Sequence, residues 1–208
     1  MASLVLETSV WQEINSPLIA GLDEAGRGAL AGPVVAAAVI LPLTRPDQLA
    51  LLNKVNDSKQ LTARTREKLY QLIVAQAVAW GVGIVAAEVI DRIGILPATR
   101  EAMRTAVSQL APAPDYLLID GRIRLRNLPT PQQAVIRGDS LSLSIAAASI
   151  IAKVTRDQIM TELDKNYPQY GFARHKGYGT AHHLATLAQH GPSPVHRFSF
   201  APLRNTLL

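Results

Sequence analysis

One short stretch near the start of the chain, GLDEAGRG at residues 21–28, constrains the fold and the chemistry more than any other. It follows the apolar residues 18–20 and precedes a second apolar run at 34–41. Two adjacent acids at the end of a strand, here Asp23 and Glu24, point to opposite faces of a sheet unless the backbone turns there. The glycines after them allow such a turn and a close approach of the backbone to a ligand. The stretch therefore predicts carboxylates beside exposed backbone N–H groups and one guanidinium.

The glycine spacing in this stretch is half of a phosphate-binding P-loop. Gly21 and Gly26 have the required separation, but Arg27 occupies the position of the P-loop lysine and Gly28 that of its serine or threonine. Two carboxylates inside the loop would also repel a phosphate directly. They could hold one only through a bound cation, because hard metal ions take carboxylate oxygens and bridge to phosphate oxygens. A metal site that faces a phosphodiester fits these residues, and a P-loop does not.

The composition predicts one globular domain over residues 1–208. Of the 208 residues, 48% are apolar and 18% are charged, so the chain can bury a sizeable core. The chain has no cysteine, which excludes disulfides, thiolate metal sites and a cysteine nucleophile. The net charge of +5 favours a polyanionic partner.

The sequence predicts neither membrane insertion nor secretion. No apolar run approaches the roughly 18 residues that span a bilayer. Glu7 and Glu13 fall in the N-terminal segment, where a secretory signal has an apolar core. Because the absence of cysteine also suits a reducing compartment, we expect a cytoplasmic protein, and we expect it to act as a monomer.

Hydrophobic patterns predict both strands and helices. Strands are expected at 19–23, 34–41, 82–87 and 116–119, with shorter candidates at 122–127 and 134–136. Helices are expected after Thr62 and Pro97, from Asp139 to about Leu163 and at 181–189, with a helical turn at 88–94. The helix after Thr62 is expected to carry its apolar face as far as Trp80, and residues 1–17 are expected to form only a polar lead-in.

The order of these elements predicts an α/β fold class. Gly32 and Pro33 mark a reversal between the first two strands, so the sheet should open as an antiparallel meander. The later strands alternate with helices, which is the order of an α/β fold. We therefore expect a mixed sheet with flanking helices, covered at one end by a small helical cap or arm formed by residues 164–208.

Four acids stand at the boundaries of predicted elements: Asp23, Glu24, Asp120 and Asp139. If the strands that end at Asp23 and Asp120 are neighbours, these side chains lie one strand spacing, roughly 5 Å, apart. Carboxylates that close repel strongly unless a cation lies between them or one holds a proton. Two metal ions about 4 Å apart, held by several carboxylates, are the arrangement for in-line phosphodiester displacement. Oxygen ligands alone favour Mg²⁺ or Mn²⁺ over Zn²⁺.

Each of these features also has a plainer interpretation. Asp120 before Gly121 could open a turn, and Asp139 could cap a helix, so only their joint placement after buried strands favours a site. Five histidines invite a zinc hypothesis, but those at 182–190 lack the acid or cysteine partners of known zinc spacings. The tripeptide at 137–139 matches a cell-adhesion motif, yet it precedes a long helix in a chain without a secretion signal.

Seven motifs together resemble the type 2 ribonucleases H, the ribonuclease HII family. The motifs are GLDEAGRG at 21–28, LAGPVVAA at 30–37, NDSKQL at 56–61, IDG at 119–121, GDS at 138–140, SIAAASIIAKVTRD at 144–157 and HKGYGT at 175–180. They run in the family's order from about residue 19 to residue 201. One departure is Arg137, where the family usually has lysine before Gly-Asp, and the positive charge is kept.

The resemblance implies a ribonuclease H-like fold and a metal-dependent endoribonuclease. Such an enzyme cleaves the RNA strand of RNA–DNA hybrids and the 5′ side of single ribonucleotides embedded in duplex DNA, leaving 5′-phosphate and 3′-OH ends. The resemblance also implies two divalent ions, Mn²⁺ or Mg²⁺. It assigns both catalysis and metal binding to Asp23, Glu24, Asp120 and Asp139.

The resemblance also implies which residues bind the substrate. It assigns recognition of the ribose 2′-OH to Gly26, Arg27 and Gly28, and contact with the following deoxyribose to Tyr178. Lys59 and Lys176 could be solvated surface charges, the usual role of lysine. Their neighbours in sequence, Asp57 and Ser58 for Lys59 and Tyr178 for Lys176, favour contact with phosphates instead. The link between Asp120 and Asp139 is a variable region of the family, so no contact is implied for it.

Two other functions remain open from the sequence. A non-catalytic nucleic-acid binding module would use the acids only as turn and cap residues, but a binder gains nothing from carboxylates that face phosphates. A nuclease of the same fold that cuts DNA junctions would share the acids. The 26–28 motif together with Tyr178 argues for recognition of ribose instead.

Overall fold

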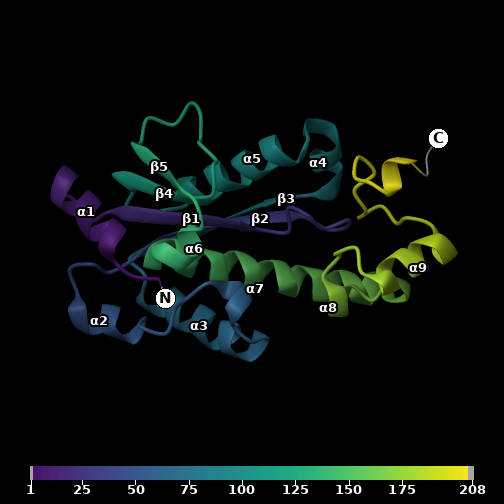
Figure 1. Cartoon of the computed structure of the whole chain (residues 1–208), viewed down its shortest axis with the longest axis horizontal. Coiled ribbons are helices and arrows are strands. Elements are labelled where there is room, and N and C mark those ends of the chain that lie inside the picture. The colour runs from purple at the N-terminus through teal and green to yellow at the C-terminus, as the bar shows by residue number, and fades with distance from the viewer. Residues whose placement is uncertain (1, 206–208) are drawn as a thin grey trace.

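The computed structural model describes residues 2–205 and contains a five-stranded mixed sheet in the order β3-β2-β1-β4-β5 (Figure 1). β1 (Ile19–Ala25), β2 (Val34–Ile40) and β3 (Ala79–Val85) form an antiparallel meander. β4 (Tyr116–Asp120) runs parallel to β1, and β5 (Gln132–Val135) runs parallel to β4. The expected mixed sheet with an antiparallel opening is therefore confirmed.

Helices cover both faces of this sheet. α7 (Leu143–Asn166) packs on β1 and β2 from one side, with α3 (Ala63–Gln76) against it, and α5 (Ile95–Ser108) packs on β2 and β3 from the other side (Figure 1). Because successive strand residues point to opposite faces, Ala36 and Ala38 of β2 enter the core under α5. Ala37 and Val39 enter the core under α7. β2 is consequently buried along its whole length.

Close approach of α7 to the sheet depends on a glycine in β1. A Cβ added at Gly21 would overlap the backbone of Ser144 near the start of α7. Only glycine therefore lets the first turns of α7 lie against β1. This packing brings the helix to the end of the strand that carries Asp23 and Glu24.

Short helices connect and extend these layers. They are α2 (Pro46–Leu51), α4 (Ala87–Ile93), α6 (Gly138–Leu141), α8 (Phe172–His175) and α9 (Ala181–His190), with 3-10 turns at Ser58–Gln60, Pro168–Tyr170 and Leu203–Asn205. α8 and α9 lie at the far end of α7 (Figure 1). There Tyr170 and Phe172 pack on Met160 of α7 and on Ala31 of the loop after β1. No helix among residues 2–205 is long and apolar enough to cross a membrane.

The N-terminal segment differs from the predicted polar lead-in. Residues 5–14 form a helix, α1 (Val5–Ile14), whose Val10 packs on Ile19 and Leu118. Its Glu7 is fully buried, and one carboxylate oxygen accepts hydrogen bonds from the Ser142 and Ser144 side chains at the start of α7. The helix is stabilised by these distant contacts, so a local pattern does not reveal it.

Three other expectations were wrong in detail. Residues 122–127 form a loop. The side-chain amide of Gln132 accepts a hydrogen bond from the N–H of Leu125 and donates one to its carbonyl, so these groups bond to a side chain instead of a neighbouring strand. β5 begins at Gln132 instead of residue 134. Trp80 lies in β3 and not on the preceding helix, since α3 ends where Ala77 adopts an extended conformation. α2 was not predicted.

Candidate active site

Two neighbouring strands bring acids to one edge of the sheet. Asp23 and Glu24 lie near the end of β1, and Asp120 is the last residue of β4. The parallel pairing matches Leu22 with Ile119, so Asp23 and Asp120 follow at adjacent positions. The neighbouring strands assumed in the sequence analysis are therefore present.

The fourth acid reaches the same edge through a separate turn. Asp139 lies in α6, a single helical turn, and not at the start of the long helix as expected. α7 has its own N-cap, Ser142, whose hydroxyl accepts from the N–H of Ile145 at 3.2 Å. Asp120 holds α6 in place because its Oδ1 accepts from the N–H of Gly138 at 2.7 Å. The end of β4 and the turn that carries Asp139 are thus joined directly.

These elements surround a cavity of about 390 Å³. It is lined by three of the acids, the glycine-rich motif, Tyr178 and four residues from other elements: Asp23, Glu24, Asp120, Ala25, Gly26, Arg27, Gly28, Tyr178, Ser58, Lys59, Ser149 and Lys153. Segments from residue 23 to residue 178 therefore meet at one place. Eight of the ten residues predicted for the site line this cavity, and Asp139 adjoins it through Lys59, whose Nζ lies 2.8 Å from Asp139 Oδ2.

Burial and mutual repulsion both disfavour the charged forms of the acids. Burial raises the pKa of Asp23 well above its usual value, and the charges of Glu24 and Asp120 raise it further. Burial also raises the pKa of Glu24, against the opposing hydrogen bond from Arg27. For Asp120, burial and then the charge of Asp139 raise the pKa. A cation placed among these carboxylates would relieve the repulsion.

Two side-chain cations of the protein already neutralise part of this charge. Lys59 pairs with Asp139, and Arg27 Nη1 lies 2.9 Å from Glu24 Oε1. Burial lowers the pKa of Lys59, but the hydrogen bond and charge of Asp139 outweigh it, so the net shift is upward. Within residues 2–205, no three acid or histidine side chains meet closely enough to hold an ion as they stand.

The acids nevertheless fit a hard divalent metal ion. All their donor atoms are carboxylate oxygens, which Mg²⁺ and Mn²⁺ prefer. The second oxygen of Glu24, Oε2, is buried and has no hydrogen-bond partner among the described residues. Lys59 is 75% exposed in its side chain and flexible, so it can leave Asp139 without disturbing the fold. Bound metal ions could therefore replace Lys59 and Arg27 as the cationic partners of these acids.

Glycine occupies positions 26 and 28 for different structural reasons. Gly26 has φ of +92°, and a Cβ there would overlap the guanidinium of Arg156. Gly28 would place a Cβ in open space, with no atom within 4 Å. The expectation that glycine serves a close approach to a ligand therefore suits Gly28, which lines the cavity. At Gly26 the requirement comes from the protein itself.

Tyr178 lines the same cavity as the acids at the strand ends. Tyr178 is 38% exposed, and it follows Lys176 and Gly177, both of which have positive φ. The Arg156 guanidinium lies 5.5 Å from the centre of its ring, and Lys153 Nζ lies 6.0 Å away. One part of the ring is thus fixed by cations while the rest stays accessible.

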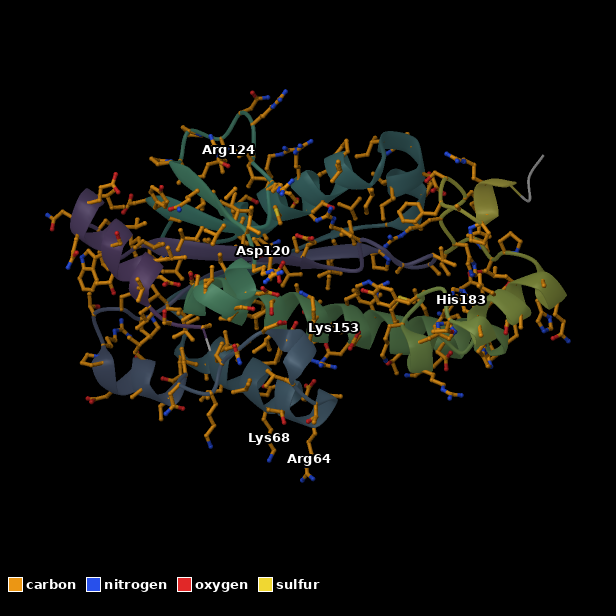
Figure 2. The ribbon with its side chains drawn as sticks, in the orientation of Figure 1. Arg64, Lys68, Asp120, Arg124, Lys153 and His183 are labelled. Carbon is orange, nitrogen blue, oxygen red and sulfur yellow. The ribbon has the colours of Figure 1, made fainter. Side chains whose placement is uncertain are left out.

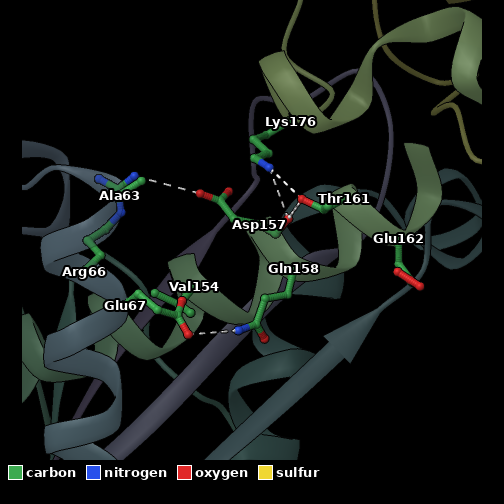
Figure 3. Close-up of a pocket in the computed structure, with 9 residues that line it drawn as sticks. All are labelled: Ala63, Arg66, Glu67, Val154, Asp157, Gln158, Thr161, Glu162 and Lys176. Atoms are coloured by element: carbon green, nitrogen blue, oxygen red, sulfur yellow. Dashed lines mark hydrogen bonds and ion pairs between the residues drawn. The ribbon is translucent and has the colours of Figure 1, made fainter. Parts of the chain in front are cut away.

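Lys176 does not join the acids. It lines a second cavity, of about 410 Å³, between α3 and α7 (Figure 3). There its Nζ donates to the side chain of Thr161 at 2.9 Å and to the carbonyl of Asp157 at 3.3 Å. The Asp157 carboxylate pairs with Lys153 at 2.7 Å and lies 3.9 Å from Arg66.

Sequence reasoning missed three residues of the cavity wall, Ser58, Ser149 and Lys153. Lys153 of α7 and Asp120 of β4, both labelled in Figure 2, line the same cavity. Ser149 and Lys153 are four residues apart and so share one face of a helix, which is a signal that the sequence contains. Ser58 donates its N–H to Ser149 Oγ at 3.3 Å, and that contact joins segments 91 residues apart.

A mixed five-stranded sheet of this order, with acids at the adjoining ends of its first and fourth strands, defines a hydrolase of the ribonuclease H-like fold. Solved structures agree with this class. The crystal structure of the ribonuclease H2 from Pyrococcus horikoshii has a TM-score of 0.76 and 27% identity, over 90% of this chain and 95% of that chain. The ribonuclease HII of Archaeoglobus fulgidus, solved in complex with PCNA, has a TM-score of 0.73 and 26% identity, over 88% and 95%.

The family follows from the sequence comparisons. A family model described as ribonuclease HII matches residues 20–203. A ribonuclease HII of Geobacter sulfurreducens is 58% identical over 189 residues, which is 91% of this chain and 84% of the relative. The chain belongs to the ribonuclease HII family, a family of endoribonucleases that hydrolyse phosphodiester bonds.

Proposed function

We propose that this endoribonuclease requires divalent metal ions and cleaves both the RNA strand of RNA–DNA hybrids and the 5′ side of single ribonucleotides in duplex DNA. Cleavage would leave 5′-phosphate and 3′-OH ends. One observation carries the proposal: buried and partly buried acids at the ends of β1 and β4 share a cavity with an open glycine backbone and a half-exposed tyrosine. The acids suit hydrolysis, and the other two features suit recognition of sugars.

Asp23, Glu24, Asp120 and Asp139 would hold two Mg²⁺ or Mn²⁺ ions. When bound, these ions would activate the attacking water and stabilise the leaving 3′ oxygen. The raised pKa of Asp23 and the unpartnered oxygen of Glu24 support this assignment. Lys59 and Arg27, released from the acids, would turn to phosphates of the substrate strand.

Recognition of the ribose would use the backbone of Gly26, Arg27 and Gly28. A 2′-OH both donates and accepts hydrogen bonds, and it is the group that distinguishes RNA from DNA. The open space beside Gly28 supports a close approach of the sugar to this backbone. The ring of Tyr178 would pack on the next sugar, where deoxyribose fits and a further 2′-OH would be crowded. Lys176 would contact phosphates farther along the duplex.

We infer that the enzyme works as a monomer in the cytoplasm. The residues assigned to the site all lie within this chain, so the proposed chemistry needs no second copy. The absence of cysteine suits a reducing compartment.

The test is cleavage of a DNA duplex that carries one ribonucleotide, with Mg²⁺, with Mn²⁺ and with EDTA. We expect one cut on the 5′ side of the ribonucleotide in either metal and none in EDTA. Two matched controls accompany this assay. The wild-type enzyme should yield no product from an all-DNA duplex, and the variant Asp120→Asn should yield none from the ribonucleotide-containing duplex. Binding without any cleavage in both metals would favour a non-catalytic binding module instead.

A further inference from the structure

Arg156 lies on α7 between two segments that face the active-site cavity. One is the 26–33 loop, and the other is the Tyr178 turn, defined as residues 175–178. The side chain is fully buried, and each of its nitrogens donates to a backbone carbonyl. Nε donates to Pro33 at 2.9 Å and Nη2 to Ala31 at 3.1 Å, while Nη1 donates to Lys176 at 2.9 Å. One guanidinium thus joins the loop to the turn.

This guanidinium has no acidic partner within ion-pair distance among residues 2–205. Burying an uncompensated charge is costly, and burial lowers the pKa of Arg156 accordingly. Charge-assisted hydrogen bonds to three carbonyls offset that cost. The planar fork of arginine can hold three acceptors in fixed directions, and a lysine ammonium at this site cannot.

Independent contacts make the same connection. The N–H of Leu30 in the loop donates to the carbonyl of Gly177 in the turn at 2.8 Å. Gly26 has no Cβ to obstruct the Arg156 side chain beside it. The Arg156 cation also lies over the ring of Tyr178. The loop and the turn are therefore joined both by the Arg156 side chain and by a direct backbone hydrogen bond.

We propose that Arg156 is a specificity-determining positioning residue, which fixes the Tyr178 ring relative to the Gly26–Gly28 backbone so that two successive sugars are recognised as one unit. The inference rests on the proposed function of this site. Arg156 does not touch the substrate. It sets the separation between the group that recognises a ribose and the group that accepts a deoxyribose after it.

Arg197 provides a matched control in the same chain. It is also fully buried and also bonds only to carbonyls, with Nε on Gly32 at 2.9 Å and Nη1 on Arg27 at 3.0 Å. Both of these carbonyls belong to the 26–33 loop. Arg197 therefore supports the loop without a side-chain hydrogen bond to the Tyr178 turn.

The experiment compares Arg156→Lys and Arg197→Lys on two substrates, a duplex with one embedded ribonucleotide and a uniform RNA–DNA hybrid. We expect Arg156→Lys to lower the ratio of the two single-turnover rates, junction over hybrid, by about tenfold or more. Arg197→Lys should lower both rates by a similar factor and leave the ratio unchanged. In a Tyr178→Ala background, Arg156→Lys should not change the ratio further.

A folded Arg156→Lys enzyme that keeps the wild-type ratio would overturn the inference. That result would leave the proposed function intact, whereas failure of the wild type to cut either substrate would refute the proposed function itself. If Arg156→Lys melts below the assay temperature, hydrogen exchange on the wild type decides. The amides of Leu30 and Tyr178 should gain protection together when the junction duplex binds in Ca²⁺, and protection of only one would contradict the inference.

Discussion

The carboxylate edge, formed by Asp23, Glu24, Asp120 and Asp139, and the Tyr178 turn face the same cavity. The protein stabilises these two regions in opposite ways. Three of the acids, Asp23, Glu24 and Asp120, lie on regular strands, and burial followed by the charge of neighbouring carboxylates raises the pKa of Asp23 and Asp120. The turn has an irregular backbone with two residues at positive φ. Its carbonyls are nevertheless bonded: Lys176 to Arg156, Gly177 to Leu30, and Tyr178 to both Thr180 and His183.

The difference shows what each side needs from its surroundings. A site that binds cations gains affinity from repulsion among its ligands, since binding relieves that repulsion. A surface that distinguishes two sugars must be rigid before the substrate arrives, because ordering it during binding would weaken discrimination. We therefore expect substitutions among the acids to affect hydrolysis, and substitutions around the turn to affect the choice of substrate.

The largest expected effect is at the carboxylate edge. Asp23→Asn should lower the cleavage rate by about 10²–10³-fold, the loss typical when one group that stabilises transition-state charge is removed. Duplex binding measured in Ca²⁺ should change little, because Ca²⁺ supports binding but holds the attacking water poorly. In EDTA the variant should have a higher melting temperature than the wild type, since the substitution removes a buried charge from a cluster of carboxylates that repel one another. A variant with more than about a tenth of the wild-type rate would rule out this role for Asp23.

Gly26 and Gly28 sharpen the comparison because they differ in what a side chain would meet. Gly28→Ala should fold normally, since its Cβ enters open space, but should cleave about tenfold more slowly, as expected for the loss of about 1.4 kcal/mol of transition-state binding. Gly26→Ala should melt at a lower temperature because its Cβ meets Arg156. Thermal melting and single-turnover rates on both variants test this. Equal melting losses would mean that the two glycines serve one structural purpose.

A smaller effect concerns the histidines behind the Tyr178 turn. His183 bonds the carbonyl of Tyr178 at 3.0 Å and His196 at 3.0 Å. Burial and then the charge of His183 lower the pKa of His196 to about 4. Unfolded histidine titrates near 6.5, so the unfolded chain binds more protons between these values. The contribution of His196 to the free energy of unfolding should therefore fall as the pH falls from about 6.5 to about 4.

Melting temperatures at pH 7 and pH 5 measure this dependence. His196→Gln, which does not titrate, should lose less stability than the wild type over that interval. His190→Ala is the control, because His190 is exposed at the end of α9 and should keep the full wild-type dependence. A His196→Gln protein with the same pH dependence as the wild type would show that His196 does not contribute to stability in this way.

The carboxylate edge could be predicted from the sequence because its signals are local. Apolar runs locate β1 and β4, and an acid at the end of each strand marks a shared edge once the strands are taken as neighbours. Most of the sheet followed from the same patterns. The position of Asp139 was predicted only approximately, since the separate turn α6 depends on its bond to Asp120.

The support of the Tyr178 turn could not be predicted, because its contacts join distant segments. Arg156 bonds to Pro33, 123 residues away, and a sequence gives no sign that such an arginine is buried. For the same reason, the role of Gly26 was attributed to the ligand although the protein itself requires it. The placement of Lys176 beside Tyr178 in sequence suggested the cavity, but its side chain turns to the groove between α3 and α7.

We expect the acids to determine hydrolysis and the Tyr178 turn to determine the choice of substrate. Substituting the ring of Tyr178 tests this claim most directly. The measurement is the ratio of single-turnover rates on a single-ribonucleotide duplex and on a uniform hybrid. The account predicts that Tyr178→Ala lowers this ratio by about tenfold or more, and that Tyr178→Phe keeps it near the wild-type value because the ring face makes the contact. Melting temperatures verify that both variants are folded. A folded Tyr178→Ala enzyme with the wild-type ratio would contradict the account.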